Sequence, residues 1–287
     1  MASLKAIRKR IASVKNTQKI TKAMKMVSAA KLRRAQDAAT NARAYAEKLS
    51  ELMRQVAASM SDTPHPLLQR RERAVGRVDL LLITADRGLC GAYNSNLIRR
   101  AEQLLADHGR ERVHVTFVGR RGFDYFKKRG VVIADKHINL FGGPDLALAR
   151  RLADHLANEY AEEKTDAVFV LYSHFRSALS QVPTVEQLLP IVPAAVSPEG
   201  VREYVVEPDA ATLLDRLLHQ YVRVLVHRAF LEAQASEHAA RMTAMDSATS
   251  NAADMIDRLT LEMNRARQAA ITKELMEIVS GAEALKG

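Results

Sequence analysis

The sequence predicts an α/β fold in which a long antiparallel coiled coil of the N- and C-terminal helices carries an inserted Rossmann-like α/β domain. Neither Pro nor Gly occurs in residues 1–63 or 209–280, and these are the two strongest helix-breaking residues, so two very long helices are expected. All eight prolines and ten of the twelve glycines lie in residues 64–208. In that middle segment, short apolar runs alternate with helical patterns.

We therefore expect three parts: a coiled-coil helix over 1–63, an α/β domain over 70–208, and a second coiled-coil helix over 209–287. At about 1.5 Å per residue, sixty helical residues span roughly 90 Å, far more than the width of a domain of this mass. Such helices must project from the domain. Because they lie at opposite ends of one chain, they can share a seam only by running antiparallel.

The first helix has a heptad seam with large residues at its ends and small or polar residues in its middle. The seam consists of Leu4, Ile7, Ile11, Val14, Gln18, Thr21, Lys25, Ser28, Leu32, Ala35, Ala39, Ala42, Ala46, Leu49, Met53 and Val56. The second helix has one seam at Leu214, Leu218, Tyr221, Leu225 and Ala229, and another at Ala252, Met255, Ile256, Leu259, Met263, Ala266 and Ala270. Alanine and serine in a seam let two backbones approach closely. The alternative is two separate helices packed on a globule.

The middle segment reads as strands and helices in alternation. Strands are expected at 78–84, 112–119, 131–134, 166–175 and 202–208, and helices at 95–109, 120–130 and 145–163. Buried β-branched strands separated by helices of about ten to twenty residues indicate a sheet with crossover connections.

Composition excludes several classes of protein. The chain has 287 residues, 47% of them apolar, which is enough to bury a core. The single cysteine, Cys90, excludes an intramolecular disulfide, so a cytosol-facing protein is expected. No window reaches the roughly 18 to 20 apolar residues of a membrane span, and the N-terminus has charges where a signal peptide needs its apolar segment. A soluble or peripheral protein is expected.

The positive charge is concentrated at the N-terminus. The chain has 43 Lys and Arg against 33 Asp and Glu, a net charge of +10. Residues 1–36 contain neither Asp nor Glu. Their basic residues are Lys5, Arg8, Lys9, Arg10, Lys15, Lys19, Lys22, Lys25, Lys31, Arg33 and Arg34. A field of one sign attracts an anionic partner, which can be nucleic acid, acidic lipid or an acidic protein surface. The alternative is a solvated helix face.

The stretch ITADRGLCGAYNSN, residues 83–96, follows an apolar run and raises the question of nucleotide binding. Gly88 and Gly91 lack the third glycine of G-x-G-x-x-G, and the stretch lacks a Walker A loop. Asp86 would also repel a phosphate. We expect instead that Asp86 caps the following turn and that the glycines permit a tight backbone path.

No residues suggest catalysis, and no cofactor or metal is expected. The nine histidines occur singly, outside any metal-binding pattern. Cys90 has the basic neighbour Arg87 but no evident base, so a buried structural thiol is expected. A nucleic-acid-binding coiled coil remains the alternative function, although alanines rather than leucine heptads follow the basic block and aromatic stacking platforms are missing.

Three segments carry a resemblance to a known family. They are IASVKNTQKITKAMKMVSAAKLRRAQ near the N-terminus, the central DRGLCGAYN, and the C-terminal block from ASEHAARMTAMDSATSNAADM to VSGAEAL. All three closely resemble gamma subunits of F-type ATP synthases. The family pattern I-T-x-E-x-x-[DE]-x-x-x-G-A falls on Ile271, Thr272, Glu274, Glu277, Gly281 and Ala282.

The resemblance implies a non-catalytic rotor shaft of the proton-translocating ATP synthase. In this family the coiled coil enters the cavity of the alpha and beta subunit hexamer, and the α/β domain grips the epsilon subunit and the c-ring. One copy per complex turns with the ring, couples ion flow to ATP synthesis or hydrolysis in the beta subunits, and regulates ATPase activity. No nucleic acid is a partner.

The resemblance also implies roles for individual residues. The family's lower contact with the beta subunit falls on Met24 and Lys25, and its upper contact falls on Arg267 and Gln268. An acidic loop of each beta subunit would face the basic helix from Lys9 to Lys31. A further set forms a loop at the foot of the shaft that braces the coiled coil: Asp86, Arg87, Gly88, Cys90 and Gly91.

One departure from plant chloroplast gamma chains is informative. Those chains carry an inserted segment with a cysteine pair, whereas this chain has Cys90 alone and only the short AAVSPEGVRE between its late strands. A thiol-disulfide switch is therefore not expected. The lack of an organelle transit peptide favours a peripheral protein on the cytoplasmic face of a bacterial inner membrane, with a processed mitochondrial chain as the alternative.

Overall fold

The structure is a computed structural model that describes residues 4–59, 65–71, 76–140, 145–192 and 209–284. Two helices account for much of it: α1 (Leu4–Ser59) and α5 (Ala210–Ala284). By their contacts, the residues form two compact units. Unit 1 is Met1–Val27 with Met242–Gly287, and unit 2 is Ser28–Arg241. Both helices therefore contribute residues to both units.

The two long helices predicted from the missing Gly and Pro are present. Helix α1 has 56 residues and α5 has 75 residues. Asp209 precedes α5 and accepts a hydrogen bond from the Thr212 backbone N–H at 2.8 Å, as an N-cap residue does. This bond and a second one from the Thr212 hydroxyl hold the pKa of Asp209 below its usual value.

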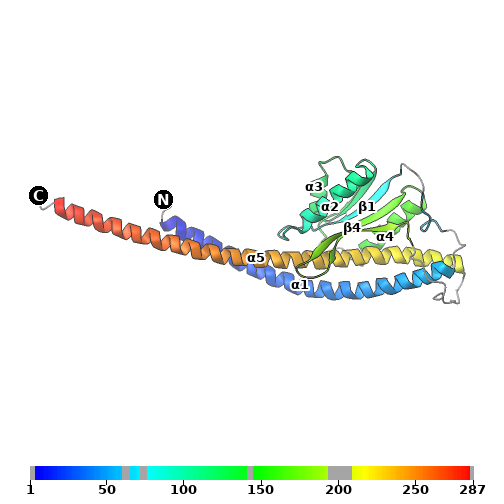
Figure 1. The fold of residues 1–287 in the computed structure, drawn as a ribbon, viewed down its shortest axis with the longest axis horizontal. Coiled ribbons are helices and arrows are strands. Elements are labelled where there is room, and N and C mark those ends of the chain that lie inside the picture. Colours follow the sequence, from blue (N-terminus) through cyan, green and yellow to red (C-terminus); the bar gives the residue numbers. More distant parts are fainter. Residues whose placement is uncertain (1–3, 60–64, 72–75, 141–144, 193–208, 285–287) are drawn as a thin grey trace. The chain divides into compact units, whose positions relative to one another are not determined.

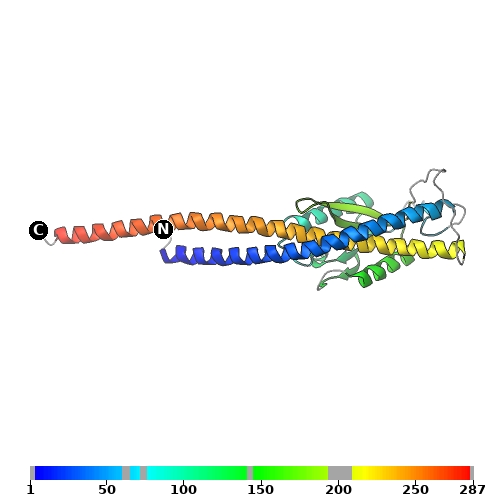
Figure 2. The same cartoon turned by 90° about the horizontal axis from the view of Figure 1, so that it is seen from below.

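In unit 1 the two helices lie side by side and run antiparallel (Figures 1 and 2). Thr249 of α5 donates to Thr21 of α1 at 2.8 Å, and Lys25 pairs with Asp246, so residue numbers rise on one helix as they fall on the other. The residues of α5 that are buried here are Met245, Ala252 and Leu259. They are seven positions apart, which is the period of a single seam.

Unit 2 contains a five-stranded sheet in the order β3-β2-β1-β4-β5. The strands are β1 (Val78–Ile83), β2 (Val113–Val118), β3 (Val132–His137), β4 (Ala167–Phe175) and β5 (Gln181–Leu189). The first four are parallel, and β5 runs antiparallel to β4. The α/β sheet with crossovers is thus confirmed.

The sequence did not predict β5. The fifth strand that it did predict, at 202–208, lies outside the residues that the structure describes. Strand β5 contains Pro183, which cannot donate a backbone hydrogen bond and is tolerated only where one side of a strand is free. Because β5 is the last strand of the sheet, it meets this condition.

Helices cover both faces of the sheet. They are α2 (Tyr93–His108), α3 (Arg120–Phe126) and α4 (Leu146–Ala161). Successive residues of β1 point to opposite faces, so Leu80 and Leu82 pack with α2 and α3, whereas Leu81 and Ile83 pack with α4 and α5. Within unit 2, α5 therefore lies between the sheet and α1 (Figure 1).

The predicted seam of α1 coincides with its protected face. Every one of its sixteen predicted positions is buried or half-buried. In α5 one predicted seam residue is wrong, because Met255 is 49% exposed. Its neighbour Ile256 is half-buried instead. Adjacent helical residues point about 100° apart, so the two could not both face α1.

Candidate functional site

The order of the strands places a switch point between β1 and β4. In open α/β sheets the chain reverses its direction of growth there, and ligands bind outside the carboxyl ends of the two strands. Phe175 ends β4 and the stretch 83–96 follows β1 at this edge. Three hydrogen bonds join this edge of the sheet to α5.

The three bonds come from different residues. The Phe175 backbone N–H donates to the Glu232 carboxylate at 2.8 Å. The Tyr93 hydroxyl donates to the Ala233 carbonyl oxygen at 3.2 Å, and burial raises the pKa of Tyr93 well above its usual value. Arg241 donates to the Gly88 carbonyl oxygen at 3.4 Å. The loop after β1 and the start of α2 are thus each attached to α5.

Asp86 does not cap the turn that follows it, so that prediction is wrong. Its carboxylate accepts backbone hydrogen bonds from Arg120 at 2.8 Å, Asn139 at 2.9 Å and Leu140 at 2.7 Å. These donors lie at the start of α3 and after β3. The reason is tertiary: β1, β2 and β3 are consecutive in the sheet and parallel, so the segments that follow them lie at one edge, where the carboxylate satisfies their backbone N–H groups.

The expected tight path at the glycines holds at Gly91, whose φ of 56° lies in the left-handed region. Leu89 has φ of 61° and is 64% exposed at the tip of the same loop. A close approach also requires glycine at the end of β2, since a Cβ on Gly119 would lie 2.0 Å from the Thr84 carbonyl oxygen. The loop therefore rests tightly on its neighbours.

Cys90 is the buried structural thiol that was predicted. Its side chain is 1% exposed, and the Asn94 amide donates to its sulfur at 3.1 Å. Burial raises the pKa of the thiol, which opposes formation of the reactive thiolate. The residue fills space in the core between β1 and α2.

Neither a metal-binding cluster nor a membrane-spanning helix occurs among the described residues. Within 4–59, 65–71, 76–140, 145–192 and 209–284, no group of three or more His, Cys, Asp or Glu could hold a metal ion. In those same ranges, no helix has the length and apolar character needed to cross a membrane.

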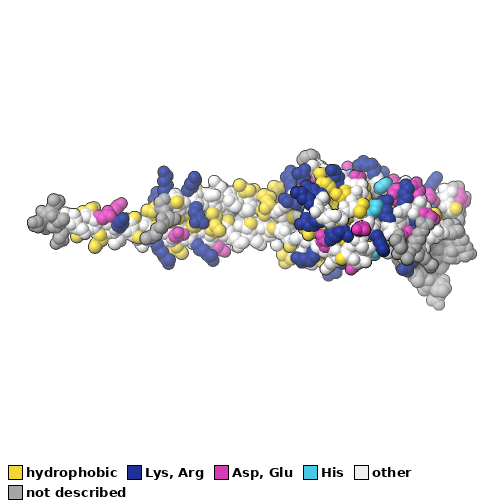
Figure 3. Space-filling model, turned by 90° about the horizontal axis from the view of Figure 1, so that it is seen from above, with side chains coloured by type: hydrophobic (Ala, Val, Ile, Leu, Met, Phe, Trp, Pro, Cys, Tyr) yellow, Lys and Arg dark blue, Asp and Glu magenta, His cyan; other side chains and the backbone are white. Residues whose placement is uncertain are grey.

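Most of the basic residues of α1 lie in unit 1, where Lys25 pairs with Asp246 at 2.5 Å. Met24 beside it is half-buried, and Lys19 and Lys22 are exposed. A groove of about 430 Å³ lies here, lined by Gln18, Lys19, Lys22, Lys25, Met26, Asp246 and Thr249. Figure 3 shows Lys and Arg side chains gathered on the helix pair near the N-terminal end of α1. The surface suits an anionic partner.

Arg267 and Gln268 lie on exposed positions of α5, also in unit 1. They are 21 residues beyond Asp246, or roughly 30 Å along the helix. The structure therefore does not bring Met24 and Lys25 together with Arg267 and Gln268. The loop residues Asp86, Arg87, Gly88, Cys90 and Gly91 belong to unit 2.

The sequence reading missed a buried polar network in unit 2. Glu232 is 1% exposed on α5 and is paired with Arg43 of α1. The signal available in the sequence was a single acid amid the apolar run around Phe230. Its basic partner is 189 positions away along the chain, so no spacing could identify the pair.

Comparison with known proteins identifies the family of this chain. The family model described as ATP synthase matches residues 3–285. The ATP synthase gamma chain of Geobacter metallireducens is 50% identical over 292 residues, with all of both chains covered. The chain belongs to the ATP synthase gamma-chain family. The predicted family resemblance is confirmed, and with it the prediction of a central-stalk, non-catalytic subunit of the F-type ATP synthase.

Solved structures agree. A structure of the Tetrahymena thermophila mitochondrial ATP synthase central stalk and c-ring is similar, with a TM-score of 0.60, 26% identity, and 80% of this chain and 99% of that chain covered. A chain of the Euglena gracilis mitochondrial ATP synthase has a TM-score of 0.68 at 18% identity, with 98% and 94% covered. The second likeness concerns the fold alone. The fold of this chain is therefore found in solved structures at low sequence identity.

Proposed function

We propose that the chain is the rotor shaft of a bacterial ATP synthase and couples ion flow through a c-ring to ATP synthesis or hydrolysis. In this proposal α1 and α5 form an antiparallel coiled coil that turns inside a hexamer of alpha and beta subunits. The observation that carries the proposal is the single seam of unit 1, where Met245, Ala252 and Leu259 recur every seven residues on the side of α5 that faces α1.

The last turns of α5 support insertion into a partner. Residues 271–281 are all exposed, and five of them are large and apolar: Ile271, Leu275, Met276, Ile278 and Val279. Apolar side chains exposed in such density mark a surface that another protein covers. We assign that surface to the cavity of the hexamer.

We propose that the lower and upper contacts with the beta subunits are Met24 with Lys25 and Arg267 with Gln268. The lower contact is supported by the exposed lysines around Lys25, because long-range attraction is easily made and released as a rotor turns. The upper contact is supported by the exposure of Arg267 and Gln268, whose guanidinium and amide groups can form directional hydrogen bonds.

We propose that the loop of Asp86, Arg87, Gly88, Cys90 and Gly91 braces the shaft at its foot. The bonds from Arg241 to Gly88 and from Tyr93 to Ala233 support this role, as they join the loop and its helix to α5. The corresponding division of the chain is a shaft of 1–63 and 209–287 with an α/β domain of 70–208. That domain would grip the epsilon subunit and the c-ring, one copy per complex, on the cytoplasmic face of the inner membrane.

One experiment tests the proposed function. A tagged chain is purified from detergent-solubilised membranes, and its partners are identified by mass spectrometry. We expect alpha, beta, epsilon and c subunits together with ATPase activity. Recovery without alpha, beta or c subunits would contradict the rotor, and salt-dependent retention on DNA would favour a nucleic-acid-binding coiled coil instead.

A second experiment tests the upper contact. The Arg267→Ala complex should assemble normally but synthesise ATP more slowly than the wild type, because the guanidinium no longer holds the beta subunit. A matched control is Arg265→Ala, which removes an exposed arginine two positions away on a different side of α5. Equal ATP synthesis by the wild type and the Arg267 variant would contradict the contact.

A further inference from the structure

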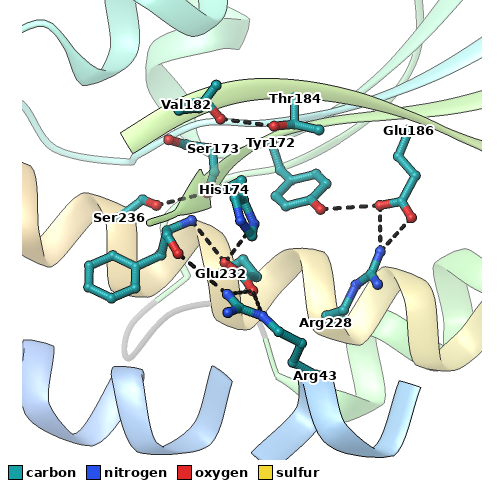
Figure 4. Close-up of polar contacts among 11 residues, drawn as sticks. Arg43, Tyr172, Ser173, His174, Val182, Thr184, Glu186, Arg228, Glu232 and Ser236 are labelled. Carbon is teal, nitrogen blue, oxygen red and sulfur yellow. Dashed lines mark hydrogen bonds and ion pairs between the residues drawn. The ribbon is translucent and has the colours of Figure 1, made fainter. Parts of the chain in front are cut away.

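Helix α5 is joined to the sheet by a row of polar side chains that we call the polar ladder: Arg228, Glu232 and Ser236. They are four residues apart, so they lie one above another on a single face of the helix. Each is bonded to β4 or β5 (Figure 4). The ladder lies wholly in unit 2.

Glu232 is the central rung and joins three elements. Its Oε1 accepts from Arg43 of α1, with Nη2 at 2.5 Å and Nε at 3.1 Å. Its Oε2 accepts from the Phe175 backbone N–H at 2.8 Å, and His174 Nδ1 lies 3.2 Å away. Both oxygens of a carboxylate that is 1% exposed are therefore satisfied.

The outer rungs fix the same face of α5. Arg228 donates through Nη2 to both carboxylate oxygens of Glu186 on β5, at 2.6 Å for Oε2, and Glu186 also accepts from the Tyr172 hydroxyl at 3.1 Å. Ser236, which is fully buried, donates to the Ser173 carbonyl oxygen at 2.8 Å. These bonds attach the helix to both strands at the edge of the sheet.

The side chains that surround the ladder are apolar. Ala229, Phe230 and Ala233 are buried beside it in the main core. Close packing of these side chains resists sliding, but hydrophobic contact is non-directional and does not bind α5 to particular atoms of the strands. Moving α5 by one residue would strand the Glu232 carboxylate without its partners, which a buried charge strongly resists.

We propose that the polar ladder sets the torsional stiffness of the joint between the α/β domain and α5, with Glu232 as its main positioning residue. This inference rests on the proposed function, since only a rotor must carry torque across this joint. A pair of packed elements could be stable without such a row of bonds, but it would yield more under a twisting force.

The test measures angular fluctuation in the assembled complex. A probe is attached to the α/β domain through Leu179→Cys, at a position 84% exposed between β4 and β5, while the buried Cys90 stays unreactive. With immobilised alpha and beta subunits holding the shaft during a catalytic pause, the variance of the probe angle is inversely proportional to the stiffness. We expect Glu232→Ala to raise the variance by roughly twofold or more, and Glu232→Gln to raise it less, since the amide oxygen still accepts from Phe175.

Two further variants keep the test decisive. Asp154→Asn is the matched control, because it removes an α5 ion pair to α4 at 2.6 Å in which Arg223 and Asp154 are 35% and 39% exposed. It should leave the variance unchanged. If Glu232→Ala does not assemble, Arg43→Met removes the half-exposed partner of Glu232 and should raise the variance as well.

The outcomes separate the two proposals. Assembled Glu232 and Arg43 variants with the wild-type variance, even with lowered thermal stability, would overturn the ladder and leave Glu232 a residue of fold stability alone. A wild-type chain that does not assemble with alpha and beta subunits would instead overturn the proposed function.

Discussion

Helix α5 is free of Gly and Pro through residue 280, but its two segments lie in different environments. From Ala210 to Arg241 it lies between the sheet and α1, and nearly every residue from Leu217 onward is buried or half-buried. From Met242 to Ala270 it packs against α1 alone, with single buried residues seven positions apart, and residues 271–281 are exposed. The alanines of both segments look alike in the sequence. In the first segment they are buried in the core formed by the sheet, α5 and α1, and in the second they allow α5 and α1 to approach closely.

The difference also changes the role of polar groups. In unit 2, Glu232 and Ser236 are almost fully buried, and every bond they make is directed to a particular strand or helix. In unit 1, the ion pair of Lys25 with Asp246 is 41% and 60% exposed. Buried polar bonds can fix an orientation, whereas exposed ones leave a surface ready for a partner.

The largest contrast is expected from truncating an apolar side chain in each segment. Phe230→Ala leaves a cavity where the side chain is 0% exposed, and it should lower the free energy of unfolding by about 3 to 5 kcal/mol. Met255→Ala, at 49% exposure, should change it by no more than about 0.5 kcal/mol. Urea unfolding of the purified variants measures both. Equal losses would show that the two segments do not differ in packing.

Enlarging an alanine should show the same contrast at a smaller scale. Ala235→Leu overpacks a position that is 0% exposed and should cost about 1 to 3 kcal/mol of unfolding free energy. Ala266→Leu, at a half-buried position of unit 1, has solvent beside it and should cost less than about 1 kcal/mol. Thermal melting followed by circular dichroism compares the two. A greater loss of unfolding free energy from Ala266→Leu than from Ala235→Leu would contradict the conclusion that unit 2 is the more tightly packed segment.

Acid should loosen unit 2 through His238. Burial, with the nearby Arg241 and Lys31, lowers the pKa of His238 from 6.5 to about 4, so the folded protein holds it neutral. The unfolded chain binds this proton more tightly between those pH values, and stability is therefore lost as the pH falls from about 6.5 toward 4. His238→Gln should flatten this part of the melting profile. Unit 1 has no histidine, and an unchanged slope in the variant would refute the assignment.

The smallest effect is expected at the exposed ion pair of unit 1. Lys25→Ala or Asp246→Ala should lower the free energy of unfolding by about 0.2 to 1 kcal/mol, and less at high salt, because water and ions screen the charges. A double-mutant cycle at two salt concentrations measures the coupling. A coupling above about 2 kcal/mol would mean that this pair acts like a buried one.

Much of the fold could be read from local patterns. The lack of Gly and Pro over the two ends corresponds to α1 and α5, and the apolar runs correspond to β1, β2, β3 and β4. The seam of α1 coincides with its protected face because a helix repeats its direction regularly, whichever partner covers it. Strand β5 was missed because Pro183 and polar residues break its apolar pattern, even though its antiparallel pairing with the preceding strand β4 is a local hairpin.

The prediction of function depended on sequence motifs typical of a family, and not on residues that could form a catalytic or binding site. The three quoted segments identified the family, but they could not show the bonds of Asp86 to the starts of α3 and of the loop after β3. Nor could they show Glu232 as a buried rung, because its partners come from α1 and β4.

By itself, the sequence determined that this protein has two long helices around an α/β domain, where the helices have a protected face, and which family it belongs to. These follow from backbone propensity, periodicity and motif, which are local properties of the chain. Only the tertiary structure decided that α5 packs on one face of the sheet, and that a polar ladder joins it to β4 and β5. Burial and bond partners depend on which distant segments meet, and no local pattern contains that information.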